Sequence, residues 1–190
     1  MKLTIACCQV PVTEDLEQNL ATAERYITNA AHRGAQIVLL PEMFCCPYDN
    51  SCFPSYAQPV DGEIAIRLAN AAKKHGIYLF AGSFPEREGE NIYNTCLIFD
   101  RTGTLIGRHR KAHLFDINVE GGVAFQESAI LTAGNAITTV LTEYGPIGVA
   151  ICFDMRFVEP FRIMALRGAK LIVLPSAFNM TTGPAHWELT

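Results

Sequence analysis

The chain has 190 residues, of which 49% are hydrophobic and 18% charged, and its formal net charge is −4. This composition excludes a disordered tail and predicts one globular domain, residues 1–190, with a sizeable core. Because the chain is acidic and has no run of basic residues, we expect no nucleic-acid partner.

The N-terminal sequence MKLTIACCQV has neither a long apolar region nor a small-residue cleavage site, so no secretory signal is expected. No stretch is apolar and long enough to predict a membrane span. The seven cysteines include no CxxC pair, which argues against a zinc ribbon and a thioredoxin-type centre. Several lie in apolar runs, where a free thiol behaves as a small hydrophobe, and we therefore expect a reducing, cytoplasmic location.

Strands and helices are expected to alternate in the first part of the chain. Apolar runs bounded by turn signals predict buried strands at 2–9 and 36–40. Helical periodicity follows each run. The first helix is expected to be capped by Thr13 and to end at Gly34, and the second to cover about 62–75. A loop rich in proline, cysteine and aromatic residues separates the second strand from the second helix.

The second part of the chain is richer in strands. Short apolar runs predict them at 77–84, 93–99, 104–110, 136–142, 146–151 and 171–175. The charged segment PEREGEN is expected to be a turn, 111–134 a loop, and 160–167 a helix. The order β-α-β-α, then a run of strands, then β-α-β predicts an α/β domain whose sheets carry helices on an outer face.

Cys152 has the position of a nucleophile. It stands between the apolar run IGVAI and the segment FDMRFVEP, which leads into a helix. Amide N–H groups and the helix dipole at such a strand end favour a thiolate and a developing oxyanion. A lone cysteine in this setting is more often simply buried, so the interpretation depends on partners.

Glu42 and Lys111 are the candidate partners. Glu42 directly follows the apolar strand QIVLLP, where a carboxylate costs desolvation free energy unless it is paired and where it suits a general base. Lys111 lies in GRHRKAHLFD, and a lysine beside a thiol lowers the pKa of the thiol and stabilises an oxyanion. A competent site is then expected to show one cysteine reacting well below about pH 8. Taken singly, Glu42 is more simply interpreted as a surface side chain at the end of a strand. Lys111, taken singly, is more often a solvated charge.

Together, the segments IVLLPEMF, GRHRKAHLFD and GVAICFDMRFVEP resemble the three signature blocks of the nitrilase superfamily, the carbon–nitrogen hydrolases, in order and in spacing. The resemblance implies a nitrilase-type α-β-β-α sandwich and a reaction without metal or organic cofactor. It also implies Glu42 as general base, Lys111 as oxyanion stabiliser and Cys152 as nucleophile. The backbone N–H of Phe153 would be a second oxyanion donor.

The family also has a second glutamate between the lysine and the cysteine. Glu127, in the segment FQES, fits this place best, and Glu120 is the alternative. The implied role of Glu127 is to orient Lys111 and the substrate amide or water. The other possibility for Glu127 is a loop side chain in solvent.

Further segments resemble one branch of the family, the omega-amidases. These segments are PYDNSCFPSYA, KAHLFDI, FQES, CFDMRF and AFNMTTGPAHWE. The branch hydrolyses the distal amide of small dicarboxylate monoamides such as alpha-ketoglutaramate and succinamate, through a thioester. Deaminated-glutathione amidases share much of the pattern and are the nearest alternative. A nitrile or carbamoyl hydrolase and an inactive interaction subunit of the same fold also remain open.

Both amidase readings need a group that binds a substrate carboxylate. Arg156, four residues after the nucleophile, is the candidate, and the alternative is that Arg156 forms an ion pair supporting the turn. Tyr48 and Phe53, in the loop after Glu42, are expected either to wall the pocket or, as often, simply to pack. His186 and Trp187 are expected to pack rather than react. Family members continue well beyond the segment HWELT and are commonly homodimers. The resemblance therefore implies a homodimer and a sandwich that is incomplete at its C-terminus, with exposed apolar surface.

Overall fold

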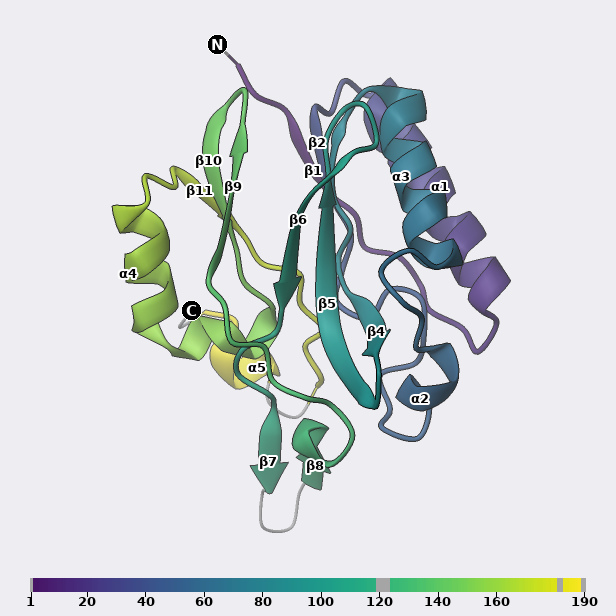
Figure 1. Cartoon of the computed structure of the whole chain (residues 1–190), viewed down its shortest axis with the longest axis vertical. Coiled ribbons are helices and arrows are strands. Elements are labelled where there is room, and N and C mark those ends of the chain that lie inside the picture. The colour runs from purple at the N-terminus through teal and green to yellow at the C-terminus, as the bar shows by residue number, and fades with distance from the viewer. Residues whose placement is uncertain (1, 119–123, 181–182, 189–190) are drawn as a thin grey trace.

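The computed structural model describes residues 2–118, 124–180 and 183–188, and these form four layers (Figure 1). Helices α1 (Leu16–His32) and α3 (Glu63–His75) cover the outer face of a large sheet. A smaller sheet faces its inner side, and α4 (Val158–Leu166) covers the smaller sheet from outside. The order helix, sheet, sheet, helix confirms the predicted α-β-β-α class.

The large sheet combines parallel and antiparallel strands. Its order is β1 (Ile5–Cys7), β2 (Ile37–Leu39), β3 (Tyr78–Phe80), β5 (Asn91–Phe99) and β4 (Phe84–Glu88), with β6 (Leu105–Arg110) also paired to β5. The first three strands are parallel, and the others pair in antiparallel fashion. Strand β5 is buried along nearly its whole length, because it pairs with β3, β4 and β6.

The prediction that the segment PEREGEN forms a turn is wrong for its first four residues. Residues Pro85 to Glu88 belong to β4, which pairs with β5. The charged Glu86 is tolerated in a strand because it is buried against Arg108 and Arg110 of β6, which also pairs with β5, and these arginines neutralise it.

The small sheet has three strands, in the order β11 (Leu171–Val173), β10 (Gly145–Val149) and β9 (Thr138–Thr142). Gly148 brings α4 close to this sheet, because a Cβ atom at that position would lie 2.5 Å from Met164 Sδ. Short elements also occur where only loops were expected. They are α2 (Phe53–Tyr56), β7 (Asp116–Asn118), β8 (Ala124–Gln126) and the one-turn 3-10 helix η1 (Glu127–Ala129).

Two apolar clusters hold the layers together. One lies between α1, α3 and the large sheet. The other lies between the sheets, where Ile37, Phe80 and Ile98 meet Val140, Ile147 and Val149. Burial of this kind stabilises by roughly 1.5–3 kcal/mol for each large side chain.

The cap of α1 differs from the expectation. Asp15, not Thr13, is the N-cap, and its side chain accepts the N–H of Gln18 at 3.1 Å. Thr13 lies two residues too early for this role, and its hydroxyl instead contacts the side chain of Asn19. Both residues are good capping types, so composition alone did not separate them.

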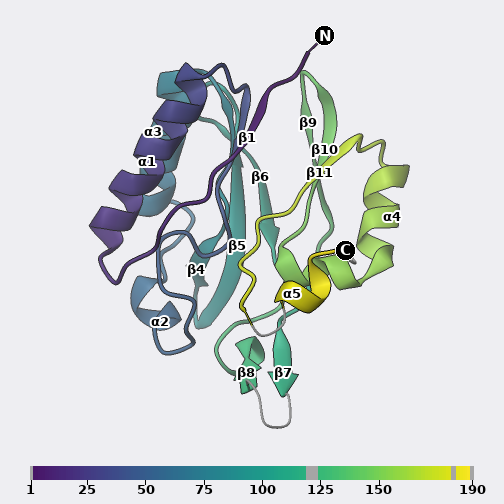
Figure 2. The ribbon, with the colours of Figure 1, turned by 180° about the vertical axis from the view of Figure 1, so that it is seen from behind.

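The C-terminal part returns toward the large sheet. After β11 the chain descends between the lower ends of the two sheets and reaches α5 (Gly183–His186) (Figure 2). The expectation that Trp187 packs is largely wrong: 68% of this residue is exposed, and its ring makes an edge-to-face contact with the ring of Phe178. The side chain of His186 lies outside the described residues. None of the described helices has the length and apolar character needed to span a membrane.

Candidate functional site

Four predicted residues meet where strands end. Glu42 follows β2, Lys111 directly follows β6, Glu127 opens η1, and Cys152 opens the 3-10 turn η2 (Cys152–Arg156) after β10. Glu42 is 3% exposed, and Lys111 and Glu127 are fully buried. The structure therefore brings together side chains that are up to 110 positions apart in the sequence.

Lys111 lies between the two glutamates. Its Nζ is 2.9 Å from Glu42 Oε1 and 2.9 Å from Glu127 Oε2. A backbone N–H group also donates to each carboxylate: Ala177 N donates to Glu42 Oε2, the oxygen that does not contact the lysine, at 2.9 Å, and Phe115 N donates to Glu127 Oε2 at 2.6 Å. With both carboxylates and the lysine charged, the cluster has a net charge of about −1.

Tyr48 connects the same groups. Its hydroxyl lies 3.1 Å from Glu42 Oε1 and also contacts Glu127 Oε1, and Lys111 Nζ donates to it at 3.3 Å. Because a phenol has one proton, it donates to only one carboxylate at a time. Burial, followed by the charges of Glu42 and Glu127, raises the pKa of Tyr48 well above its usual value, so the phenol stays protonated.

The ionisation of the cluster follows from its charges. Burial lowers the pKa of Lys111, but the carboxylates of Glu42 and Glu127 outweigh burial and bring that pKa above its ordinary value. Lys111 is therefore an ammonium at neutral pH. Burial raises the pKa of Glu127, and Lys111 offsets only part of that rise.

The surroundings of Cys152 favour the thiol over the thiolate, against the expectation of a cysteine that reacts well below pH 8. Burial is the largest cause that raises the pKa of Cys152, and the neighbouring charge of Glu42 adds to it. Lys111 opposes this rise without reversing it. A thiolate would be a further negative charge in a cluster that is already acidic, so we expect it to form only as its proton moves to a base.

The backbone is strained at Cys152 and at the residue that follows Glu42. Among the described non-glycine residues, only Met43 (φ 51°) and Cys152 (φ 43°) have positive φ angles. Such a conformation costs about 1–3 kcal/mol and persists where surroundings hold it. Here Ser83 Oγ accepts the Met43 N–H at 3.0 Å, and the Pro175 carbonyl accepts the Cys152 N–H at 2.9 Å. Among the described residues, no carbonyl accepts the N–H of Phe153.

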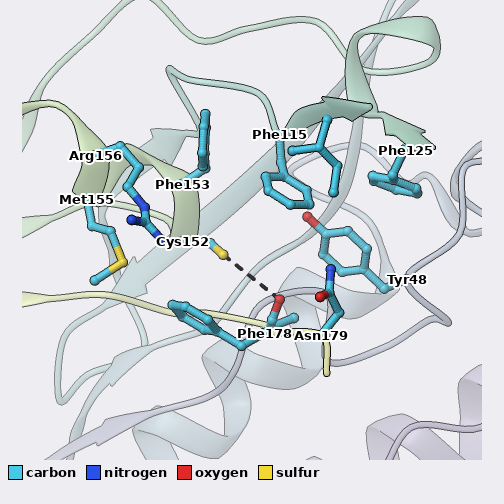
Figure 3. A pocket seen from close by; sticks show the side chains of 11 residues that line it. Tyr48, Phe115, Phe125, Cys152, Phe153, Met155, Arg156, Phe178 and Asn179 are labelled. Carbon is cyan, nitrogen blue, oxygen red and sulfur yellow. Dashed lines mark hydrogen bonds between the residues drawn. The ribbon is translucent and has the colours of Figure 1, made fainter. Parts of the chain in front are cut away.

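A cavity of about 560 Å³ opens over Cys152 (Figure 3). Its walls are mostly apolar and aromatic, and the lining residues are Tyr48, Phe115, Ile117, Phe125, Cys152, Phe153, Met155, Arg156, Ala177, Phe178 and Asn179. Arg156 supplies the one charged side chain of this lining. Figure 3 shows Arg156 on one side of Cys152 and the rings of Phe115 and Phe125 on the other. The Cys152 Sγ lies 4.0 Å from the Ala177 carbonyl.

The structure also decides between the alternatives for the outer residues. Within the described residues Arg156 forms no ion pair, so these residues give no support to the alternative of a supporting ion pair. Tyr48 lines the cavity as expected, but its hydroxyl belongs to the carboxylate cluster. Phe53 does not line the cavity: it is fully buried and packs edge-on against Tyr48, at 5.7 Å between ring centroids. Glu120 lies outside the described residues.

Sequence reasoning missed two polar residues beside the site. The side-chain amide of Asn94, in the apolar strand β5, donates to Glu42 Oε1 at 2.9 Å. The backbone carbonyl of Asn94 accepts the backbone N–H of Lys111 at 2.8 Å. Asp154, two residues after Cys152, is 1% exposed and fully surrounded by donors. Asn94 carried a signal, because a polar residue inside an apolar run needs a partner when it is buried, although the sequence does not identify that partner. Asp154 lies in the mixed segment FDMRFVEP and carried no such signal.

Comparisons with known proteins agree with this geometry. A model of the carbon-nitrogen hydrolase family matches residues 4–190. The chain is 47% identical over 188 residues to omega-amidase NIT2 of Xenopus tropicalis, an alignment that covers 99% of this chain and 68% of that protein. It is also 47% identical to the chloroplastic omega-amidase of Arabidopsis thaliana, covering 99% of this chain and 52% of that protein.

A solved structure shows the same fold. Saccharomyces cerevisiae Nit3, described as a member of branch 10 of the nitrilase superfamily, superposes with a TM-score of 0.84 and 38% identity over 95% of this chain and 66% of that one. The chain thus spans between about half and about two thirds of the length of these relatives. With the family model matched over nearly every residue, the chain belongs to the carbon-nitrogen hydrolases of the nitrilase superfamily.

Proposed function

We propose that this chain carries the catalytic site of a cysteine-dependent omega-amidase, which hydrolyses a small dicarboxylate monoamide to the dicarboxylate and ammonia. The observation that carries the proposal is the contact between a buried lysine and two carboxylates beside Cys152. Cys152 itself lines a cavity in which Arg156 is the one charged lining side chain. The omega-amidases among the similar proteins support the branch.

In the first half of the reaction, Cys152 Sγ attacks the amide carbon while Glu42 accepts the thiol proton. A general base in contact with the thiol is required because the resting group is a thiol. The ammonium of Lys111 and the backbone N–H of Phe153 stabilise the tetrahedral oxyanion. Glu42 then gives the proton to the leaving nitrogen, ammonia departs, and a thioester on Cys152 remains.

The second half reverses the proton transfers. Glu42 takes a proton from a water molecule, whose oxygen attacks the thioester carbon. The tetrahedral intermediate collapses, the carboxylic acid is released, and the proton returns to the sulfur of Cys152. Glu127 holds Lys111 through both halves, since its carboxylate contacts Nζ at 2.9 Å, and it orients the substrate amide or water.

Arg156 is assigned to the distal carboxylate of the substrate. A guanidinium binds a carboxylate in a two-pronged geometry, and Arg156 has no competing ion pair among the described residues. The apolar walls formed by Phe115 and Phe178 suit the methylene groups between the amide and the acid. A neutral amide lacks the partner for Arg156 and is expected to bind weakly.

The test is ammonia release from succinamate by the purified chain beside Cys152→Ala and Cys7→Ala. Cys7 is exposed and distant from the cavity, so its variant is a matched control for loss of a thiol. Release by the parent and by Cys7→Ala, with none from Cys152→Ala, supports the proposal. Release that survives in Cys152→Ala refutes the nucleophile. A folded parent that hydrolyses deaminated glutathione but not succinamate assigns the site to the neighbouring branch.

A further inference from the structure

The carboxylate of Asp154 joins two segments that carry reacting side chains. It takes no part in the steps above. Its Oδ2 accepts the N–H of Ile151, the residue before the nucleophile, at 2.9 Å. Its Oδ1 accepts the N–H groups of Ala112 at 3.2 Å and His113 at 2.9 Å, the two residues that follow the oxyanion lysine. One buried carboxylate therefore links the turn of the nucleophile to the strand end of the lysine.

Two imidazole rings complete the surroundings of Asp154. His109 Nε2 lies 3.2 Å from Oδ2, and His113 Nδ1 lies 2.8 Å from Oδ1. The other ring nitrogen of His109 meets Thr138 Oγ1 at 3.1 Å, and the ring of His113 stacks on Phe157 with 3.7 Å between centroids. Each ring is therefore held by a second contact in addition to its contact with the carboxylate.

Charge stabilises this arrangement. Burial raises the pKa of Asp154, but the hydrogen bonds from His109, from the Ile151 N–H and from His113 outweigh burial, and the pKa lies below its usual value. Asp154 is therefore ionised at neutral pH and accepts strong hydrogen bonds. Bonds from backbone N–H groups to a charged acceptor are shorter and stronger than bonds between neutral groups.

We propose that Asp154 is a positioning residue that sets the separation of the Cys152 sulfur from the Lys111 ammonium without touching substrate. The inference rests on the proposed function. The strained φ angle of Cys152 persists only while the peptides around it are held, and Asp154 holds the peptide just before it. A displacement of about 1 Å between reacting groups costs about 100-fold in rate.

The experiment compares Asp154→Asn and His113→Phe with the parent chain. Asn keeps the shape of Asp154 but replaces one accepting oxygen with a donor, which then faces N–H groups. Phe keeps the stack on Phe157 and removes only the bond from the ring to the carboxylate. Asp100→Asn is the matched control, because Asp100 also accepts several bonds in a turn, from Thr102 and Thr104, but on a distant hairpin.

Two readouts are measured on each folded variant. The first is kcat and KM for succinamate. The second is the rate at which iodoacetamide alkylates Cys152, resolved by peptide mass spectrometry against the exposed Cys7 in the same molecule. We expect Asp154→Asn to lower kcat by about 100-fold with KM within about twofold. Alkylation of Cys152 relative to Cys7 should slow by about tenfold, and by about threefold in His113→Phe, with no change in Asp100→Asn.

The outcomes separate the possibilities. A folded Asp154→Asn chain whose kcat and alkylation ratio stay within about twofold of the parent overturns the positioning role. Where Asp154→Asn does not fold, His113→Phe decides: slower alkylation of Cys152 supports the role, and an unchanged ratio overturns it. A parent that releases no ammonia, with alkylation still slowed in both variants, refutes the proposed substrate and leaves the role of Asp154 supported.

Discussion

Replacement of Glu42 by glutamine is expected to lower the rate of hydrolysis strongly and the stability of the fold only modestly. The carboxylate accepts from Lys111 and Asn94 on one oxygen and from the Ala177 N–H on the other, each at 2.9 Å. Glutamine keeps one oxygen that accepts a hydrogen bond. Its NH2 group then faces an N–H donor of Lys111, Asn94 or Ala177, and that donor loses its acceptor. Leaving a buried donor unsatisfied costs about 1–3 kcal/mol, so we expect a folded variant with a modest loss of stability.

The same change removes the general base. Loss of a positioned base costs about 10²- to 10⁴-fold in rate, or about 2.7–5.5 kcal/mol of transition-state stabilisation. We therefore expect kcat for succinamate to fall by that factor. At the same time the charge of Glu42 no longer raises the pKa of Cys152, so the thiolate forms at lower pH than in the parent.

The assay combines turnover with a pH profile of Cys152 alkylation. A variant with lost turnover and an alkylation midpoint moved to lower pH supports Glu42 as the base for a resting thiol. Glu86→Gln is the matched control, because Glu86 is equally buried and ion-paired but lies away from the cavity. An unchanged alkylation midpoint in Glu42→Gln, or a midpoint that rises, refutes the reasoning about charge at the site.

Three further changes have defined outcomes. Lys111→Met leaves two buried carboxylates without a cation, and we expect it to lower the free energy of unfolding by about 3–5 kcal/mol, as measured by urea titration. A loss below about 1 kcal/mol would show that the glutamates are not both ionised. Arg156→Gln is expected to raise KM for succinamate at least about tenfold while leaving hydrolysis of neutral butyramide unchanged, and equal effects on both amides would remove Arg156 from substrate recognition. Gly82→Ala places a Cβ atom 2.1 Å from the Pro41 carbonyl, at a φ of 58°, so we expect thermal unfolding at a clearly lower temperature, and an unchanged melting temperature would contradict this close approach.

Local sequence patterns were sufficient for an α/β class, and the resemblance to the signature blocks of the family supplied the sandwich and the candidate site residues. Apolar runs and helical periodicity predicted most elements, because each reports which face of a short segment is buried. Glu42, Lys111 and Cys152 were recognised because each stands directly beside such a run, inside a recognisable block. The limits of single elements were less secure. The strand β4 contains charged residues, and only the arginines of β6 make its burial possible.

The tertiary structure alone decided how the site is ionised and held. The sequence suggested a thiolate, since a lysine was expected beside Cys152, but the fold also brings two carboxylates to that lysine. A pKa depends on burial and on the sum of nearby charges, and those charges come from segments far apart in the chain. Asn94 and Asp154 were missed for the same reason: the partners that make a buried polar residue part of a site become visible only when distant strands are brought together.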